Sequence, residues 1–414
     1  MKHLVILGAG TAGTIVANGS RRRLSADWEV IVVDPSIEHL YQPGLLFVPF
    51  GGSTELARPR VDTFAHGVDW VRMGVDGIDP HARKVSLSNG ETLPYDVLVV
   101  ATGCRIRPDL LPGLTDAGWN TTQHEFYTLT GAKRLEAALT SFQGGRVVVD
   151  LVESRFKSPL APVEFLFLLD EHLTRRGLRA RCDLVLATPL DAVFHKARAA
   201  AKLDALLAEK GIRVATGFAA ASVDGERRLL RAHDGRTEPY DLLVSVPTHS
   251  GARWAELGGH GDQRAFIATD PHTLRAKGMD NVFVLGDATD LPTSKAGSVA
   301  HFQAEVLVGD LARIAEGADP LGGFDGHANC FVETGHGKAI LIDFSDDVEP
   351  LPGTYPIPGV GPFTLLEETR RNHWGKRAFE WMYWNGLLPA HPMPVPTHLS
   401  MAGKHLPREM HHPY

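Results

Sequence analysis

The sequence contains very little cysteine. Three cysteines occur in 414 residues, at Cys104, Cys182 and Cys330, and long stretches of chain separate them. This number and spacing exclude a disulfide-stabilised scaffold and a zinc site of the CxxC type. A cysteine with a role in this chain is therefore expected to act as a reactive thiol, whereas Cys182, just before an apolar run, is interpreted as a buried small hydrophobe.

Long apolar runs are absent as well. No uninterrupted run approaches the roughly 20 residues that span a bilayer. The chain opens on a strand-like segment without a signal-peptide pattern. We expect a protein that is soluble or lies on a membrane surface, on the cytoplasmic side.

A surplus of positive charge and a metal-binding spacing are also missing. The 49 acidic residues outnumber the 42 lysines and arginines, so the chain lacks the broad positive field that nucleic-acid binding usually requires. The 20 histidines form no HExxH or paired His/Cys spacing, and His411 and His412 are interpreted as part of a tail. We therefore expect neither a nucleic-acid partner nor a metal.

A dinucleotide-binding pattern stands at the start of the chain. It consists of an apolar strand, a GxGxxG turn, a helical run, a second apolar strand and a terminal acid, at residues 4–7, Gly8, Gly10, Gly13, residues 30–33 and Asp34. Gly8 permits the tight turn, Gly10 lets a pyrophosphate approach the backbone, and Gly13 lets helix and strand pack closely. Free N–H groups at the start of the helix attract the phosphates, and Asp34 is placed to accept a hydrogen bond from a ribose hydroxyl.

Two later segments end in residues suited to the same site. In chain order, the predicted elements are a hairpin over 85–100 with its turn at Asn89-Gly90, the Ala101-Thr102-Gly103 segment, a strand over 281–285, Gly286-Asp287 and a helix over 298–312. An Asn-Gly pair between alternating runs is typical of a hairpin. An acid at the carboxyl end of a strand, such as Asp287, lies where open α/β sheets bind ligands.

A second α/β segment begins near Gly145. Its predicted elements are a strand over 147–149, a helix over 162–176, a strand over 184–186 and a helix before Gly211. Its first turn, residues 150–162, contains no glycine. A pyrophosphate could not approach such a backbone closely, so binding of NAD(P) there is disfavoured.

The character of the chain changes from about Phe324. The sequence predicts two strands between 325 and 344, a Pro/Gly-rich extended stretch over 349–362 and a helix over 365–388. At helical spacing, the core-facing stripe of this helix is predicted to be Trp374, Ala378, Trp381, Met382 and Leu388. Tyr383, Trp384 and Leu387 fall outside the stripe. A second apolar surface near basic residues is typical of helices that lie on membranes, and the alternative is a homo-oligomer interface.

The order of these features resembles the two-dinucleotide-domain flavoproteins of the pyridine nucleotide-disulfide oxidoreductase superfamily. The resemblance implies an α/β fold with two Rossmann-like dinucleotide-binding domains of the glutathione-reductase type, followed by a C-terminal region with an amphipathic helix. It implies a discontinuous FAD-binding domain over 1–108 and 249–323, a second Rossmann-like domain over 109–248, and a C-terminal quinone- and membrane-interaction region over 324–414. FAD would be lined by Gly8, Gly10, Gly13, Asp34, Thr102, Gly103, Gly286 and Asp287.

Further segments are similar to sulfide:quinone oxidoreductases, and the type III-like branch looks nearest. The matching segments are Tyr41-Gln42-Pro43-Gly44, 283–297, Cys330 to Gly335, 341–344 and Asn372 to Lys376. In that family two cysteines flank the flavin, sulfide attacks their disulfide, and electrons pass through the flavin to a quinone. The resemblance therefore implies FAD as cofactor, sulfide and quinone as substrates, and a peripheral membrane location.

The resemblance also implies roles for individual residues. Cys330 matches the C-terminal cysteine, and Phe331 beside it matches an aromatic residue on the quinone side. Lys376 and Phe379 resemble the flavin-neighbouring lysine and a quinone-contacting aromatic residue. Glu164 matches the acidic residue near the sulfur site, where a raised pKa would allow proton transfer.

Ser158 is the main departure from that pattern, because it stands where the family has its other cysteine. A serine hydroxyl cannot form a disulfide and is a poor sulfur acceptor, so this chain cannot perform the two-cysteine cycle. Ser158 is an engineered or recoding-related stand-in, or Cys330 works alone with an external acceptor, or sulfide turnover has been lost. Cys104 as a replacement thiol is disfavoured, because its turn belongs near the adenosine side of FAD in this layout.

Two alternative functions stay open. A type II NADH:quinone dehydrogenase-like enzyme needs no cysteine pair, but the glycine-free turn argues against it. The other alternative is a non-catalytic flavoprotein, in which Ser158 marks the loss of sulfide turnover.

Overall fold

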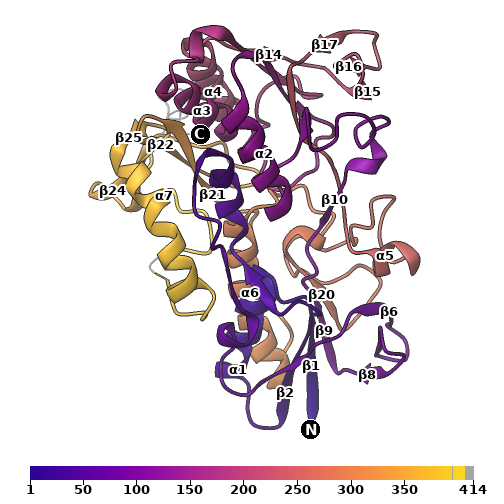
Figure 1. Ribbon diagram of the computed structural model, residues 1–414. Coiled ribbons are helices and arrows are strands. Elements are labelled where there is room, and N and C mark those ends of the chain that lie inside the picture. Colours follow the sequence, from indigo (N-terminus) through magenta and orange to yellow (C-terminus); the bar gives the residue numbers. More distant parts are fainter. Residues whose placement is uncertain (394, 406–414) are drawn as a thin grey trace.

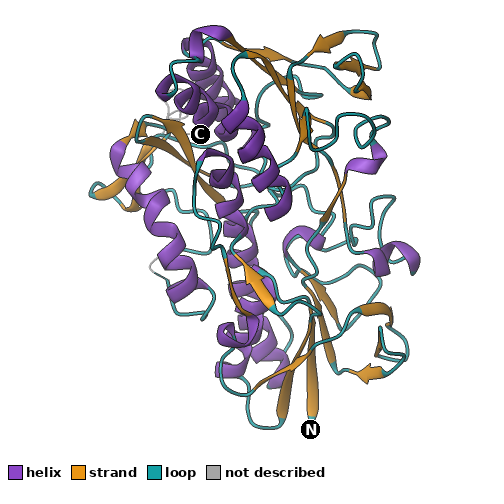
Figure 2. Ribbon diagram, in the orientation of Figure 1, coloured by secondary structure: helices purple, strands orange, loops and turns teal. Residues whose placement is uncertain are grey.

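The computed structural model describes residues 1–393 and 395–405 and contains two parallel five-stranded sheets with helices packed against them (Figure 1). Figure 2 shows the first sheet near the N-terminus at the bottom of the view and the second near the top. This α/β architecture confirms the predicted fold class. His411, His412 and the end of the predicted C-terminal region lie outside the described residues.

The first sheet is wholly parallel and has the order β20-β9-β1-β2-β5. Its strands are β1 (Lys2–Leu7), β2 (Trp28–Val33), β5 (Val68–Val71), β9 (Val97–Val100) and β20 (Val282–Val284). Helices α1 (Thr11–Arg23) and α6 (Gly297–Ala315) pack against one another beside it. Since parallel strands end at the same edge, β1, β9 and β20 bring their carboxyl-terminal turns together there.

The predicted hairpin over 85–100 is wrong in its second arm. Strand β7 (Lys84–Leu87) pairs with β8 (Thr92–Pro94) and with β6 (Val75–Asp79), whereas β9 joins the first parallel sheet between β1 and β20. Pro94 has no N–H to continue an antiparallel ladder. All four residues of β9 are buried, as a strand covered on both faces requires.

The second sheet is also parallel and has the order β11-β18-β12-β13-β14. Its strands are β11 (Gln123–His124), β12 (Gly145–Leu151), β13 (Cys182–Ala187), β14 (Ile212–Ala215) and β18 (Leu242–Val246). The helices of this part are α2 (Leu129–Ser141), α3 (Ala161–Arg175) and α4 (Ala197–Glu209). An antiparallel sheet of β15 (Ala220–Asp224), β16 (Leu229–Ala232) and β17 (Thr237–Pro239) follows α4 and β14 in the chain.

The chain crosses between the two sheets at one antiparallel pair. Strand β10 (Arg105–Arg107) pairs with β19 (Thr248–Ser250), and short helix α5 (Arg253–Leu257) follows. A further small pair, β3 (Glu38–Leu40) with β4 (Ala57–Pro59), lies after β2. The crossing falls beside the predicted boundaries at 108 and 249, but the division into domains remains our proposal.

A third sheet occupies the C-terminal part. It is formed by β21 (Ala328–Gly335), β22 (Lys338–Phe344), β23 (Gly353–Ile357), β24 (Gly361–Leu365) and β25 (Glu368–Thr369). The two strands predicted around Gly335 and Gly337 are β21 and β22, and the extended stretch forms β23 and the start of β24. Figure 1 shows this sheet and α7 (Arg370–Met382) along one side of the molecule.

The last helix begins later than predicted. Leu365 belongs to β24, and the helix begins at Arg370, where the Thr369 hydroxyl accepts the Asn372 N–H at 3.1 Å as an N-cap. A π-helical turn, Tyr383–Leu387, continues α7.

The predicted core-facing stripe of this helix is right for Leu388, which is buried, but wrong for its two tryptophans. Trp374 and Trp381 are 70% and 71% exposed, whereas Tyr383, Trp384 and Leu387 are buried. The tryptophans lie seven residues apart and so share one face, and the π-helical turn changes the phase of the residues that follow. The apolar surface therefore lies on α7, and the buried cluster lies on the turn after it. Within the described residues, no helix is long and apolar enough to cross a membrane.

Asp150 is a buried carboxyl on the central strand of the second sheet. It is 0% exposed, and its register partners are Ser245 and Ala187. Burial raises its pKa from 3.8 to about 7, against the opposing effect of the Ser245 hydroxyl. The folded protein therefore holds this proton at pH values where the unfolded chain has lost it.

This proton makes stability depend on pH. A carboxyl with a raised folded pKa stabilises the protein fully below its ordinary pKa of 3.8, and that stabilisation is lost as the pH rises through about 7. We expect the free energy of unfolding of the wild type to fall over this window by up to roughly 1.4 kcal/mol per pH unit more than that of Asp150→Asn. Urea unfolding followed by circular dichroism at about pH 5 and about pH 8 checks this difference. Equal pH slopes in the two proteins would contradict it.

Candidate active site

The glycine turn after β1 has the shape of a phosphate cradle. A Cβ atom at Gly13 would lie 1.9 Å from the Gly8 carbonyl oxygen, so helix and turn meet too closely for any side chain. Gly8 has a φ of +92° and packs against Ala101. At Gly10, by contrast, a Cβ would meet no described atom within 4 Å. The open face at Gly10, at the N-terminus of α1, fits the pyrophosphate of a dinucleotide.

Asp34, directly after β2, stabilises this turn through its carboxylate. Its Oδ2 accepts the Ala9 N–H at 2.7 Å, its Oδ1 accepts the Ser36 N–H at 2.9 Å, and Arg60 lies 3.5 Å from Oδ1. A carboxylate has about four lone-pair sites, so the group still has capacity for a ribose hydroxyl. The ribose contact itself stays a prediction.

The remaining predicted FAD residues lie at the same edge of the first sheet. They are the partly exposed Thr102, Gly103, Gly286 and Asp287, which follow β9 and β20. The Gly286 N–H donates to the Gln303 side chain of α6 at 2.7 Å, and Lys295 donates to the Asp287 carbonyl at 3.0 Å. Six of the eight predicted residues thus lie in three turns at one sheet edge, with Gly13 on α1 and Asp34 beside them. This arrangement fits FAD.

Cys104 lies beside these residues, and its thiol contacts Asp287 Oδ2 at 3.7 Å. Burial raises the pKa of this thiol, and the Asp287 carboxylate raises it further. The thiol is therefore held in its protonated form, which is a poor nucleophile.

A second cluster forms where α3, β21 and α7 meet. Lys376 Nζ lies 3.0 Å from Glu164 Oε1 and donates to the Phe331 carbonyl at 2.9 Å. Glu164 is 3% exposed and accepts the Glu333 N–H at 3.0 Å. The structure thus brings together residues that lie about 210 positions apart in the chain.

Cys330 precedes Phe331 on β21 and belongs to this cluster. Burial raises the pKa of its thiol to about 11, Lys376 opposes that shift, and Glu164 adds to it. At neutral pH the thiol is therefore protonated, and its reaction as a nucleophile requires a base.

Ser158 lies in the turn before α3, the helix that carries Glu164 in its first turn. Its N–H donates to the Lys295 carbonyl at 2.7 Å, and its carbonyl accepts the Ala161 N–H at 2.8 Å. Its φ of +52° is a left-handed conformation that few residues other than glycine adopt. The turn is thus tied to the Lys295 segment next to Asp287, and no hydrogen bond of Ser158 within the described residues runs to Cys330.

The two predicted quinone-side aromatics lie on neighbouring elements. Phe331 packs edge-on against Phe363 with ring centroids 5.1 Å apart. Gly375 of α7 allows this, since a Cβ there would lie 2.6 Å from the Phe363 ring and 2.8 Å from that of Phe331. Phe379, partly buried, lies one turn further along α7.

The sequence does not predict several polar contacts of this region. Glu333 and His373 stand inside the segments that carry the family resemblance, but nothing in the local pattern indicated that they pair. Tyr383 was assigned only to an apolar surface, yet its hydroxyl bonds Thr11 and His39 at 2.8 and 2.7 Å. Hydrogen bonds between residues about 40 to 370 positions apart leave no local signal.

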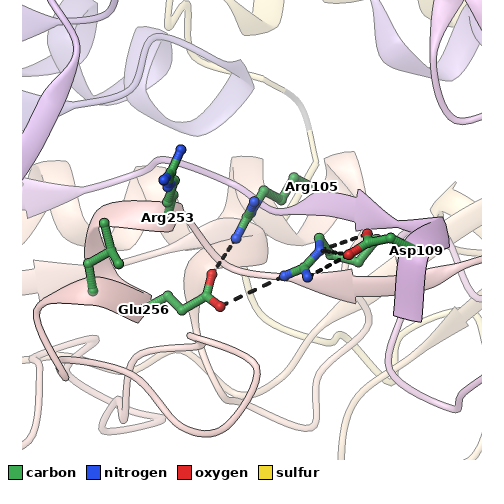
Figure 3. A pocket seen from close by; sticks show the side chains of 6 residues that line it. Arg105, Asp109, Arg253 and Glu256 are labelled. Carbon is green, nitrogen blue, oxygen red and sulfur yellow. Dashed lines mark hydrogen bonds and ion pairs between the residues drawn. The ribbon is translucent and has the colours of Figure 1, made fainter. Parts of the chain in front are cut away.

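A cavity of about 410 Å³ lies elsewhere, beside β10 and α5 (Figure 3). It is lined by Arg105, Arg107, Asp109, Arg253, Glu256 and Leu257. Arg105 and Arg107 are already paired with Glu256 and Asp109. None of the predicted site residues lines this cavity, so we place the site at the two clusters described above. Among the described residues, no group of three His, Cys, Asp or Glu side chains is arranged to hold a metal ion.

Comparison with known proteins shows which sequences this chain is similar to. The family described as pyridine nucleotide-disulphide oxidoreductase matches residues 2–149. Mitochondrial sulfide:quinone oxidoreductase of Mus musculus is 25% identical over 91% of this chain and 88% of its own length. The Dictyostelium discoideum protein of the same name is 27% identical over 93% and 85%.

Solved structures share the fold over nearly the whole chain. Sulfide:quinone oxidoreductase of Aquifex aeolicus has a TM-score of 0.77 at 18% identity, covering 93% of this chain and 92% of its own. A chain in the mitochondrial ATP synthase structure of Tetrahymena thermophila has a TM-score of 0.74 at 20% identity, covering 93% and 97%. The matched sequence family, the curated relatives and the cradle at Gly10 together identify the chain as an FAD-dependent oxidoreductase with the pyridine nucleotide-disulphide oxidoreductase fold, similar to sulfide:quinone oxidoreductases.

Proposed function

We propose that this enzyme passes electrons from sulfide, or a related reduced sulfur species, to a membrane quinone. The observation that carries the proposal is the meeting of Lys376, Glu164 and the Cys330-Phe331 segment at hydrogen-bond distance. The names of the relatives support it, since mitochondrial proteins of mouse and Dictyostelium are called sulfide:quinone oxidoreductases.

Each residue of the cluster has a separate task in this proposal. Bound FAD would supply the two-electron chemistry between donor and acceptor. Cys330 receives the sulfur, and Glu164 takes the proton that must leave for the thiol or sulfide to act as a nucleophile. The Lys376 ammonium stabilises negative charge in this buried place, because it lies against Glu164 and favours the thiolate form of Cys330.

With serine at position 158, the sulfur must leave on an external acceptor. For an acceptor thiol, hydrogen sulfide, the thiol and a quinone are consumed in equal amounts and give a persulfide and a quinol. A sulfur–sulfur bond forms, one S–H bond of sulfide and the S–H bond of the thiol break, and the quinone gains the two electrons and two protons. The Ser158→Cys experiment described next tests this reaction. The same experiment tests whether Ser158 is a natural or engineered stand-in for cysteine.

One prediction of this proposal concerns position 158 and Cys330. Anaerobic addition of sulfide and a short-chain quinone to Ser158→Cys should bleach the flavin and then produce steady turnover, because a disulfide with Cys330 becomes available. Cys330→Ala should abolish sulfide-dependent bleaching, whereas Cys182→Ala, altered at a buried thiol of the second sheet, should behave as the wild type. Flavin absorbance measures all of these variants.

The outcomes of this experiment separate the alternatives. If no variant responds to any sulfur donor, the protein is a non-catalytic flavoprotein, as Ser158 in place of cysteine would suggest. Bleaching of the flavin by NADH would favour a type II NADH:quinone dehydrogenase instead, against the glycine-free turn over 150–162.

A second prediction concerns Glu164. Glu164→Gln keeps the size of the side chain but removes the proton acceptor, so the rate of sulfide-dependent flavin reduction should fall by about 10²- to 10⁴-fold. Stopped-flow absorbance measures this rate, and Glu171→Gln, two turns further along α3, is the matched control. A rate for Glu164→Gln within a factor of about two of the wild type would remove Glu164 from the mechanism.

We also propose that the protein docks on the cytoplasmic face of a membrane through α7 and the neighbouring β23–β24 loop. The large exposed apolar side chains here are Ile357, Val360, Trp374 and Trp381. Arg370, Arg371 and Arg377 are exposed on the same helix. Tryptophan beside arginine is typical of helices that lie in the headgroup region, and the quinone has to be taken from the bilayer.

The third prediction tests this docking. Replacing both Trp374 and Trp381 by Ala should weaken binding to anionic liposomes by about 100-fold, on the order of 3 kcal/mol for two buried aromatic side chains. Cosedimentation measures the binding. Leu257→Ala, a 72% exposed apolar side chain on α5, is the control and should bind as the wild type. Unchanged liposome binding together with a change from dimer to monomer in sedimentation would assign the surface to a homo-oligomer interface.

A further inference from the structure

Glu333 and His373 form a polar pair that the proposed sulfur chemistry does not use. Glu333 lies on β21, two residues after Phe331, and His373 lies on α7, three residues before Lys376. Residues three apart on a helix share a face, so His373 and Lys376 both face β21. His373 Nδ1 lies 2.9 Å from each carboxylate oxygen of Glu333.

The pair leads from the surface to the buried cluster. The His373 side chain is 28% exposed and that of Glu333 only 3%. The Glu333 N–H donates to Glu164 Oε1, which in turn holds Lys376 at 3.0 Å. The His373 side chain is therefore open to solvent, whereas the side chains of Glu333 and Glu164 are both buried.

The charged groups around Glu333 make it able to change its protonation. His373 and Lys376 face it from α7, and Glu164 faces it from α3. Burial raises the pKa of Glu333, Glu164 adds to the shift, and the two groups of α7 oppose it. A carboxyl with a raised pKa holds a proton more readily than an exposed glutamate does.

Quinone reduction needs such a supply of protons. Each quinone takes up two electrons and two protons, and a site enclosed by protein and lipid obtains its protons only along polar groups. We propose that His373 and Glu333 form a proton path from the α7 surface to the Glu164–Lys376 pair during quinone reduction. The inference rests on the proposed function, because it assigns the proton supply of the same site.

The path starts where the quinone is proposed to enter. His373 is the neighbour of the exposed Trp374, with ring centroids 6.1 Å apart. Protons and quinone would therefore reach the enzyme on the same side, from the aqueous edge of the docking surface. The two residues act through Glu164 and Lys376, so they are positioning residues for proton transfer.

The experiment follows reoxidation of the reduced flavin, which needs no sulfide. The holoenzyme is photoreduced anaerobically and mixed with either a short-chain quinone or ferricyanide, which accepts electrons without protons. We expect Glu333→Gln and His373→Ala to slow reoxidation by quinone about 10²-fold and to leave reoxidation by ferricyanide unchanged. Glu368→Gln, which alters the ion pair with Lys338 on β22, is the control and should match the wild type with both acceptors.

Two further measurements separate a proton path from a merely structural pair. Imidazole in the buffer should restore the rate of His373→Ala, because the site is open to solvent at that end. Reduced-minus-oxidised infrared spectra of the wild type should contain a protonated carboxyl band that shifts in heavy water and disappears in Glu333→Gln.

The following results would contradict the proposed proton path through His373 and Glu333. Equal slowing with quinone and ferricyanide would mean that the pair only holds α7 against β21, and so would failure of imidazole to restore the rate. Normal quinone reoxidation in both variants would exclude the path. If the reduced wild type transfers no electrons to quinone at all, the proposed function itself is wrong. If the wild type reacts with quinone but not with sulfide, the proton path can still be tested by itself.

Discussion

One ammonium group, Lys376 Nζ, holds the candidate active site together. It joins the first turn of α3, the backbone of β21 and helix α7, through Glu164 and the Phe331 carbonyl. Both side chains of the ion pair are largely removed from water, with exposures of 17% and 4%. Removing one partner of such a pair leaves an uncompensated charge that costs about 3–5 kcal/mol, so each partner depends on the other for its place. The position of Cys330 on β21 depends on the same contact, because it is the residue before Phe331.

The C-terminal part is tied to the cofactor cradle at a second point. Tyr383, in the π-helical turn after α7, bonds Thr11 at the start of α1 and His39 after β2. Burial lowers the pKa of His39 to about 4, with Arg60 adding to the shift, so the ring is neutral at physiological pH. Asn18 of α1 reaches the Leu388 carbonyl at 2.7 Å. Because this end of the helix is anchored in the core, the tryptophans before it are left on the surface.

Position 158 is where this chain differs from the family that it resembles. Its turn has a left-handed φ, is hydrogen-bonded to Lys295 and leads directly into α3. Only the reactive atom differs between serine and cysteine, since the two side chains have the same number of heavy atoms. The chemistry at this residue therefore decides which sulfur reaction the proposed site can carry out.

Local backbone physics made the first part of the fold predictable. A GxGxxG turn after an apolar strand has few conformations open to it, and the contact between Gly13 and Gly8 follows from that turn alone. Apolar runs bounded by turn residues likewise predicted β12, β13, β20, β21 and β22. These features depend on residues that are neighbours in the chain, so they can be read from the order of the residues without the tertiary structure.

Tertiary packing decided the rest. The strand after Pro94 could complete a hairpin or join the parallel sheet, and only the space between β1 and β20 selected the second. The face of α7 that meets the core was set by Gly375, which lets Phe331 and Phe363 approach, and by the anchoring of Tyr383. The ion pairs of Lys376 and His373 join residues about 212 and 40 positions apart. Such contacts form only after distant elements have packed, because the energy of a buried charge depends on which partner the fold places beside it.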